Sequence, residues 1–173
     1  MSNKFNYDLD FDAVDFRDHP ELYRIGVGEQ GVLLVEPYKS ELLPLWRFKT
    51  EEIATHSAEQ LYEKFEEYLN NKDFVGADMA RKYIQMGFTR ARRYANHPSG
   101  RKYAAGDDPD HEQKAYPYSS GSPRKGNEVL PRAKDAAISE KAKAAAVFKS
   151  YWDRCRAHPE YQQQKEAFRK KYY

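Results

Sequence analysis

The sequence predicts an α+β fold, in which a small antiparallel sheet or hairpin packs on two long helices, with a C-terminal helix and a long irregular loop. Three patterns lead to this expectation. Residues 22–36 place β-favouring side chains on both sides of a Gly-rich turn. Residues 50–95 carry two stretches in which apolar residues recur at the helical period. Residues 98–133 are rich in Gly, Pro and Ser, as loops are.

The first element is an acidic N-terminal arm over residues 1–21. It contains six acidic and two basic side chains, so its formal charge is −4. Apolar residues alternate with the acids as far as Asp12, and this period of two favours an extended segment with one apolar face.

The core, over residues 22–97, is expected to begin with a β-hairpin spanning Leu22–Glu36. Its turn lies at Gly28–Gly31, and Pro37 ends the second strand because proline lacks the amide that a ladder needs. Three glycines here also spell the G-x-G-x-x-G motif: Gly26, Gly28 and Gly31. In a dinucleotide fold a helix follows that motif, but here the strand VLLVE follows. The glycines are therefore interpreted as turn residues with positive φ.

Two long helices are expected to complete the core. Thr50 is expected to cap the first, because Glu51 and Glu52 follow in the turn where the helix dipole favours acids. Its buried face comprises Ala54, Ser57, Leu61, Phe65 and Tyr68. Asp73 is expected to cap the second helix, which runs to about Ala95 and carries a polar arc opposite its apolar one. The polar arc comprises Asp78, Arg81, Lys82, Gln85, Thr89, Arg92 and Arg93.

The remainder of the chain is interpreted as a loop followed by C-terminal helices that pack on the core. The loop spans residues 98–133, and its length and composition indicate a segment that is either functional or flexible. The C-terminal part spans residues 134–173. A third helix is expected from Lys134, and Pro159 is expected to begin a short final helix.

Composition excludes several classes of protein. The chain has 173 residues, a formal net charge of +2 and one cysteine, so an intrachain disulfide cannot form. Its Cys and His residues lack the spacing of a zinc site, and no metal or other cofactor is expected. The first residues lack the apolar run of a signal peptide, and no aliphatic run is long enough to cross a bilayer. A cytoplasmic protein without a membrane partner is expected.

The stretch from Arg81 to Tyr103 is the strongest indication of a binding site. It holds seven Lys and Arg side chains and no acid, although the whole chain has 29 basic and 27 acidic residues. Concentrated positive charge attracts phosphate, and interleaved aromatic rings can stack on bases. The candidate site for nucleic acid or another polyanion comprises Arg81, Lys82, Arg90, Arg92, Arg93, Tyr94, His97, Arg101, Lys102 and Tyr103.

Several functional hypotheses stay open for this stretch. The leading one is a non-enzymatic binder of nucleic acid or another polyanion. Alternatively, the bases pair with the acidic arm or form an ordinary solvated helix face. His97 is a weak candidate for a catalytic acid, which would make the protein a small phosphoryl-transfer or nuclease-like enzyme. The remaining hypothesis is a protein-interaction module that docks a partner through the arm and the C-terminal tail.

Two runs of sequence resemble a known family. They are GEQGVLLVEPYKSELLPLWRFKT at residues 28–50 and FVGADMARKYIQMGFTRARRYANHPSGRKY at residues 74–103, with PYKSE, WRF and RARRYANHxxGRKY as their distinctive motifs. Both are similar to the domain of unknown function 4385 family, over roughly residues 5–103 and part of the last helix. The resemblance implies a small uncharacterised protein of bacteria or tailed phages, located in the cytoplasm of the cell or host. It implies no activity and no catalytic residue.

Overall fold

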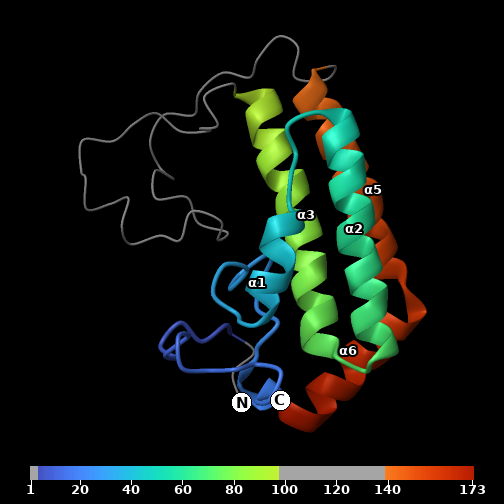
Figure 1. Ribbon diagram of the computed structural model, residues 1–173. Coiled ribbons are helices and arrows are strands. Elements are labelled where there is room, and N and C mark those ends of the chain that lie inside the picture. The colour runs from blue at the N-terminus through green and yellow to red at the C-terminus, as the bar shows by residue number, and fades with distance from the viewer. Residues whose placement is uncertain (1–3, 98–138) are drawn as a thin grey trace, which may run out of the picture.

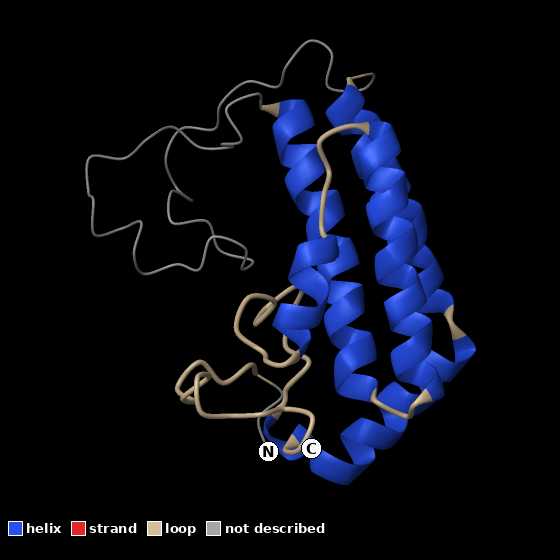
Figure 2. Ribbon diagram, in the orientation of Figure 1, coloured by secondary structure: helices blue, strands red, loops and turns tan. Residues whose placement is uncertain are grey.

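The computed structural model of the chain describes residues 4–97 and 139–173, which form an all-α structure. None of these residues belongs to a strand (Figure 2). The helical elements, with η denoting a 3₁₀ turn, are η1 (Pro20–Leu22), α1 (Tyr38–Leu42), η2 (Leu43–Leu45), α2 (Glu51–Asn70), α3 (Phe74–Asn96), α5 (Glu140–Ala157) and α6 (Pro159–Tyr172).

The long helices α2, α3 and α5 form the body of the described part of the chain (Figure 1). α2 and α3 run antiparallel and are joined by a short turn, and α5 packs against both of them. α6 turns away from the end of α5 and crosses the end of the bundle that holds the α2–α3 turn. α1 and the loops before it lie beside α3. α3 therefore contacts each of the other α-helices described: α1, α2, α5 and α6.

The helix boundaries follow local signals in the sequence. Thr50 Oγ1 accepts a hydrogen bond from the amide N–H of Ile53 at 3.2 Å. Asp73 Oδ1 accepts one from the amide N–H of Gly76 at 3.1 Å. Both residues therefore cap helices where the sequence predicts caps. Pro159 is the first residue of α6, as its restricted φ favours. The two long helices and the final helix are thus confirmed.

The expected third helix is confirmed from Glu140 onward. Ser139 caps this helix by accepting the amide N–H of Ala142 at 3.2 Å. Its predicted start at Lys134 lies outside the described residues, and so does the predicted loop over residues 98–133. No helix in the described part of the chain is long and apolar enough to cross a bilayer. Cytoplasmic location stays a prediction.

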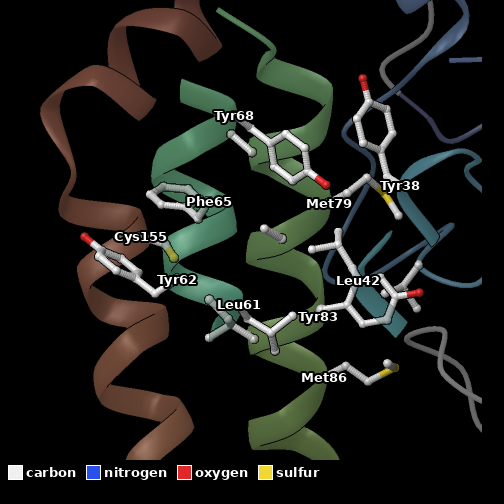
Figure 3. Packing of buried hydrophobic residues seen from close by; sticks show 14 of the residues in the cluster. Tyr38, Leu42, Leu61, Tyr62, Phe65, Tyr68, Met79, Tyr83, Met86 and Cys155 are labelled. Carbon is white, nitrogen blue, oxygen red and sulfur yellow. The ribbon is translucent and has the colours of Figure 1, made fainter. Parts of the chain in front are cut away.

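The hydrophobic core lies between α2, α3 and α5 and extends under α1 (Figure 3). The whole predicted face of α2 is buried. All residues of α3 from 74 to 84 are buried, polar ones included, because this helix is covered on every side. Gly87 lets Phe148 of α5 approach the backbone of α3, since a Cβ at this position would meet the Phe148 ring. Tyr38 and Leu42 close the core from α1.

The predicted α+β fold is wrong, because no hairpin forms over residues 22–36. The segment folds instead into successive tight turns, whose amide N–H groups donate to carbonyls three or four residues earlier. These local bonds occupy the amides that a β-ladder needs. Val32 and Val35 are both fully buried, a spacing of three that suits turns and not the alternation of a strand. The three glycines do have the predicted positive φ, but they do not form the turn of a hairpin.

The N-terminal arm is part of the core and not an extended segment. Residues 4–21 make bends and turns, and Phe5 and Phe16 are buried against the rest of the protein. The Phe5 ring lies against the backbone of Gly31. The amide N–H of Phe16 donates to the carbonyl of Glu36 at 3.0 Å. Because buried aromatic rings contribute large areas, they hold the arm in place without strand pairing, while its acids stay exposed.

Candidate anion-binding cleft

The polar arc of α3 faces the N-terminal loops, so its first two bases are buried. The exposed fraction is 7% for Arg81 and 0% for Lys82. Arg81 Nη2 donates to Asp78 Oδ1 at 2.6 Å, and Lys82 Nζ lies 3.9 Å from Asp78 Oδ2. The hydroxyls of Tyr23 and Tyr161 donate to the same carboxylate. These two bases therefore compensate a buried charge inside the protein and are not exposed surface charges.

Burial opposes ionisation of every group in this cluster, and mutual attraction decides which groups stay charged. Burial raises the pKa of Asp78, but the attraction of Arg81 and Lys82 outweighs it and holds the pKa below its ordinary value. For Lys82, burial prevails over the attraction of Asp78 and lowers the pKa to about 7. Lys82 Nζ donates to the carbonyl of Gln30 at 2.7 Å. Burial therefore makes Lys82 lose its proton at a lower pH than an exposed lysine does.

Three consecutive residues of the Gly-rich loop are tied to α3. Arg81 Nη1 donates to the carbonyl of Gly28 at 2.7 Å. Thr89 Oγ1 donates to the carboxylate of the next residue, Glu29, at 3.1 Å. Burial raises the pKa of Glu29 to about 7. The carbonyl of the third residue, Gln30, accepts the hydrogen bond from Lys82. These contacts hold the loop over α3, so the loop covers the polar arc of this helix.

The other predicted bases lie farther along α3 and do not form one surface with the first two. Three of them are half-buried: Arg90, Arg92 and Arg93. Arg92 Nε donates to Asn96 Oδ1 at 3.2 Å, within the same helix. The ring of Tyr94 lies with its centroid 5.8 Å from that of Phe48, so this half-buried residue already packs against another aromatic ring.

His97 is the residue that follows the last turn of α3. Its exposed fraction is 5%, and its amide N–H donates to the carbonyl of Arg93 at 2.8 Å. This position suits a histidine that ends a helix better than an acid open to a substrate. The last three predicted site residues lie outside the described part of the chain: Arg101, Lys102 and Tyr103.

A cleft lined by bases lies between the Gly-rich loop, α3, α5 and α6. Its volume is about 300 Å³. Four of its lining side chains are basic, and no acid is present among the described residues that line it. The four bases are Arg81 from α3, Arg156 from α5, and Lys165 and Arg169 from α6. The structure therefore joins one predicted site residue to three bases from the other end of the chain.

Positive charge converges on this cleft. Lys165 and Arg169 lie one turn apart on α6, where like charges repel. Burial lowers the pKa of Lys165, the repulsion of Arg169 lowers it further, and the attraction of Asp78 opposes the repulsion of Arg81. Arg81 is held rigidly by Asp78, whereas Arg156 and Arg169 are exposed and adjustable. An anion in the cleft would relieve the repulsion between Lys165 and Arg169 and would meet three flexible donors beside the fixed charge of Arg81.

An aromatic ring completes the wall of the cleft. Trp152 is half-buried, and the guanidinium of Arg156 lies 4.0 Å from the centre of its ring. Arg156 also pairs with Asp153, but that acid is shared with Lys149 at 2.7 Å. The charge of Arg156 is therefore only partly neutralised. The side chain lies against the ring of Trp152, an aromatic surface that can also contact a nucleobase.

Sequence reasoning missed Arg156, Lys165 and Arg169. The signal available was the spacing of four between Lys165 and Arg169, which places two bases on one face of a helix. That spacing cannot show which other element the face meets. Only the crossing of α6 beneath the bundle brings these side chains to Arg81.

A second cavity, of about 870 Å³, lies against another face of α6. Its lining mixes three acids with four bases, so it lacks the one-sided positive charge of the cleft. In the described ranges no group of three or more His, Cys, Asp and Glu side chains gathers as a metal site requires. The absence of a metal and of any other cofactor stays a prediction.

Comparison with known families finds a match over residues 6–171, to the family described as domain of unknown function (DUF4385). The match covers nearly the whole chain and includes all four bases of the cleft. It therefore extends the resemblance expected from the sequence, which covered the first part of the chain and some of the last helix. No curated protein and no solved structure matches the chain.

Proposed function

Since the chain belongs to the DUF4385 family, whose description assigns no activity, we propose a function from its anion-binding cleft. The protein binds the phosphates of single-stranded nucleic acid and does not turn the nucleic acid over. The observation that carries the proposal is the convergence of four bases from three helices on a cleft whose described lining contains no acid.

The chemistry of the cleft suits a phosphate-bearing strand. Arginine donates two parallel hydrogen bonds from its planar fork, which matches phosphate oxygens. Arg81 already donates to Asp78, Gly28 and Gln85, so it adds a fixed positive charge to the wall of the cleft. The forks open to phosphate are those of Arg156 and Arg169. Trp152 adds an aromatic surface of the kind that single-strand sites use. A cleft of about 300 Å³ admits part of one strand and not a duplex.

The other functional hypotheses gain less support from the geometry. An enzyme using His97 needs that side chain beside a substrate, but His97 is buried and does not line the cleft. The half-buried bases near the end of α3 remain candidates for additional contacts with the strand: Arg90, Arg92 and Arg93. Their contribution is separable from that of the cleft by substitution.

The test is a titration of a fluorescently labelled single-stranded oligonucleotide with the protein over a range of salt concentrations. On single strands, log K falls with log salt at a slope of about −0.7 per phosphate contacted, so three or four contacts give roughly −2 to −3. The variant Lys165→Gln/Arg169→Gln is expected to weaken binding about tenfold at low salt and to reduce the slope by about 1.4. Anisotropy of the label measures both quantities.

The matched control is Lys143→Gln/Lys170→Gln. It removes the same charge from two exposed positions that do not line the cleft, and is expected to change the affinity less than about twofold. Equal losses in the two double variants would mean that only net charge matters and would contradict the cleft. A larger loss in Arg92→Gln than in the cleft variant would place the site at the end of α3 instead.

A further inference from the structure

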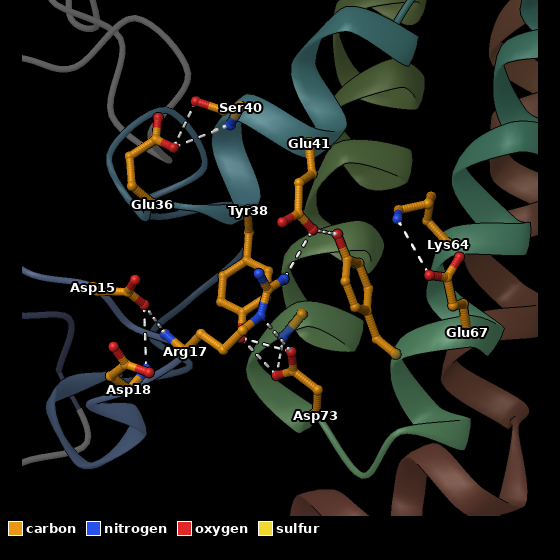
Figure 4. A network of polar contacts seen from close by, with 12 residues as sticks. Asp15, Arg17, Asp18, Glu36, Tyr38, Ser40, Glu41, Lys64, Glu67 and Asp73 are labelled. Atoms are coloured by element: carbon orange, nitrogen blue, oxygen red, sulfur yellow. Dashed lines mark hydrogen bonds and ion pairs between the residues drawn. The ribbon is translucent and has the colours of Figure 1, made fainter.

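Two carboxylates at the edge of the larger cavity are held in place by the helices around them (Figure 4). The hydroxyl of Tyr68 donates to Glu41 Oε1 at 2.6 Å. The hydroxyl of Tyr38 lies 2.7 Å from both carboxylate oxygens of Asp73, and the amide N–H of Gly76 donates to Asp73 Oδ1 at 3.1 Å. We name the group of Tyr38, Glu41, Tyr68 and Asp73 the carboxylate recess. Both acids thus have hydrogen-bond partners other than the cation that lies between them.

Arg17 of the N-terminal arm fills the carboxylate recess. Its Nη2 lies 2.9 Å from Glu41 Oε1, and its Nε lies 3.5 Å from Asp73 Oδ2. Its guanidinium carbon lies 4.8 Å from the centre of the Tyr38 ring. The guanidinium thus bridges two acids while it stacks on an aromatic face. A planar arginine fork can make all three contacts, whereas a lysine ammonium has neither the width nor the plane.

The Arg17 side chain is more exposed to solvent than the two carboxylates that it contacts. Its side chain is 44% exposed, against 30% for Glu41 and 19% for Asp73. Exposed ion pairs contribute little to stability, because water and salt screen them. Although burial opposes it, the hydrogen bonds from Arg17 and Tyr68 lower the pKa of Glu41, so this acid is ionised at neutral pH. A guanidinium that buries more surface than Arg17 can therefore take its place.

The cavity beside the recess has room for the rest of such a ligand. Its volume of about 870 Å³ falls in the range of ligand sites. Apolar side chains line part of it: Phe74, Val75 and Phe168. Two of its lysines are already paired, Lys64 with Glu67 at 3.6 Å and Lys72 with Glu160 at 2.9 Å. When Arg17 leaves, Glu41 and Asp73 lose the cation that contacts them directly, and the lining keeps Lys171 and the more distant attraction of Lys64 for Glu41.

We propose that this cavity docks an arginine-bearing peptide segment of a partner protein, whose guanidinium replaces Arg17 in the carboxylate recess. Arg17 then acts as an internal competitor that fills the recess until the partner binds. Apolar side chains next to the partner's arginine lie on the apolar part of the cavity. This docking is independent of nucleic-acid binding, because the anion-binding cleft lies against another face of α6 and attracts the opposite charge.

The test compares two acetylated Leu-Arg-Leu amide peptides, one of which carries citrulline in place of arginine. Citrulline keeps the shape of the side chain but replaces the guanidinium with a neutral urea. Calorimetric titration is expected to show binding of the arginine peptide and none of the citrulline peptide. If Arg17 occupies the recess about nine-tenths of the time, Arg17→Ala strengthens binding about tenfold. Glu41→Gln is expected to abolish it.

The matched control is Arg24→Ala, which removes another arginine of the N-terminal loops. Arg24 stacks on Tyr173, 4.9 Å from the ring centre, and does not line the cavity, so this variant is expected to bind the peptide as the wild type does. Thermal melts confirm that each variant is folded. Equal binding of the two peptides, or a folded Arg17→Ala variant that binds no better than the wild type, overturns the proposal and leaves Arg17 as a structural brace.

Discussion

Asp78 is the one fully buried carboxylate among the described residues. It accepts hydrogen bonds from Tyr23, Arg81 and Tyr161, which come from the N-terminal loops, from α3 and from α6. A buried ion pair contributes little net stability, because desolvation offsets the attraction between its members. Removing one member is different, since it leaves a buried charge without a partner. Loss of Asp78 would therefore leave Arg81 and Lys82 buried without their counter-charge.

Replacing Asp78 with asparagine is expected to lower the free energy of unfolding by about 3–5 kcal/mol, because Arg81 and Lys82 lose their shared counter-charge. Urea unfolding followed by circular dichroism measures the change. The control is Asp153→Asn, which removes an exposed acid that also pairs with two bases. It should leave stability within experimental error of the wild type. Similar stability of both variants would show that the cluster does not need its carboxylate.

Lys82 should make stability depend on pH above neutrality. Burial lowers its pKa from 10.5 to about 7, so between these values the unfolded chain binds a proton that the folded protein does not. Stability therefore rises with pH across this window, by roughly 1 kcal/mol per pH unit, and the cost of burying charged Lys82 is fully present below pH 7. The variant Lys82→Met should lack this rise, because methionine does not titrate.

Urea unfolding of the wild type and Lys82→Met at several values from pH 7 to pH 9 measures the difference. Glu29, whose pKa burial raises to about 7, is present in both proteins, so its direct contribution largely cancels. The free energy of unfolding of the wild type should increase relative to that of the variant as the pH rises. A constant difference would mean that Lys82 keeps its proton in the folded protein and that Asp78 outweighs burial.

At the scale of elements, α3 and α5 pack closely at Gly87, where there is no room for a larger side chain. Phe148 of α5 lies directly against the backbone of α3 at Gly87. Helix propensity alone favours alanine over glycine by about 0.5–1 kcal/mol in a helix interior. Packing acts in the opposite direction here, because the new methyl group overlaps a ring held by the surrounding core.

Gly87→Ala is therefore expected to destabilise the protein by about 1–3 kcal/mol, despite the better helix propensity. Thermal or chemical unfolding measures the loss. Combining the change with Phe148→Leu should recover part of it, because the smaller side chain makes room for the methyl group. A stabilised single variant would show that α5 shifts freely along α3, contrary to the close approach that the structure describes.

At the scale of the whole molecule, the N-terminal arm completes the core from one side. Its acids are exposed, while Phe5 and Phe16 are buried. One alternative left open by the sequence is that the acidic arm pairs with the basic stretch of α3, but Arg81 pairs with Asp78 of its own helix. The apolar residues of the arm, more than its charge, therefore determine where it lies.

Phe16→Ala is expected to lower the free energy of unfolding by about 3–5 kcal/mol, because it removes a fully buried ring. Tyr7→Ala is the matched control, since Tyr7 belongs to the same arm but is 43% exposed. Tyr7→Ala should lower the free energy of unfolding by clearly less than Phe16→Ala does. Deleting residues 1–18 removes Phe5 as well and should destabilise the protein further. A truncated protein with the melting temperature of the full chain would mean that the arm only covers a core that is stable without it.

The candidate site shows where sequence reasoning stops. Arg81 belongs to the predicted basic run, which is visible in one dimension because it contains no acid. Its rigid position is not visible, since it depends on Asp78 and on the loop carbonyl of Gly28. The bases that complete the cleft, Lys165 and Arg169, lie more than eighty residues away in the chain. Nothing in their own neighbourhood relates them to α3.

The sequence by itself determined the elements whose causes act within a few residues. Thr50, Asp73 and Pro159 begin helices through contacts made inside a single turn, and the apolar period sets the buried face of α2. Only the tertiary structure decided that residues 22–36 form turns and not a hairpin, and that the polar arc of α3 is covered. The reason is that a loop's conformation and a polar group's burial depend on partners distant in the chain, and folding alone brings these together.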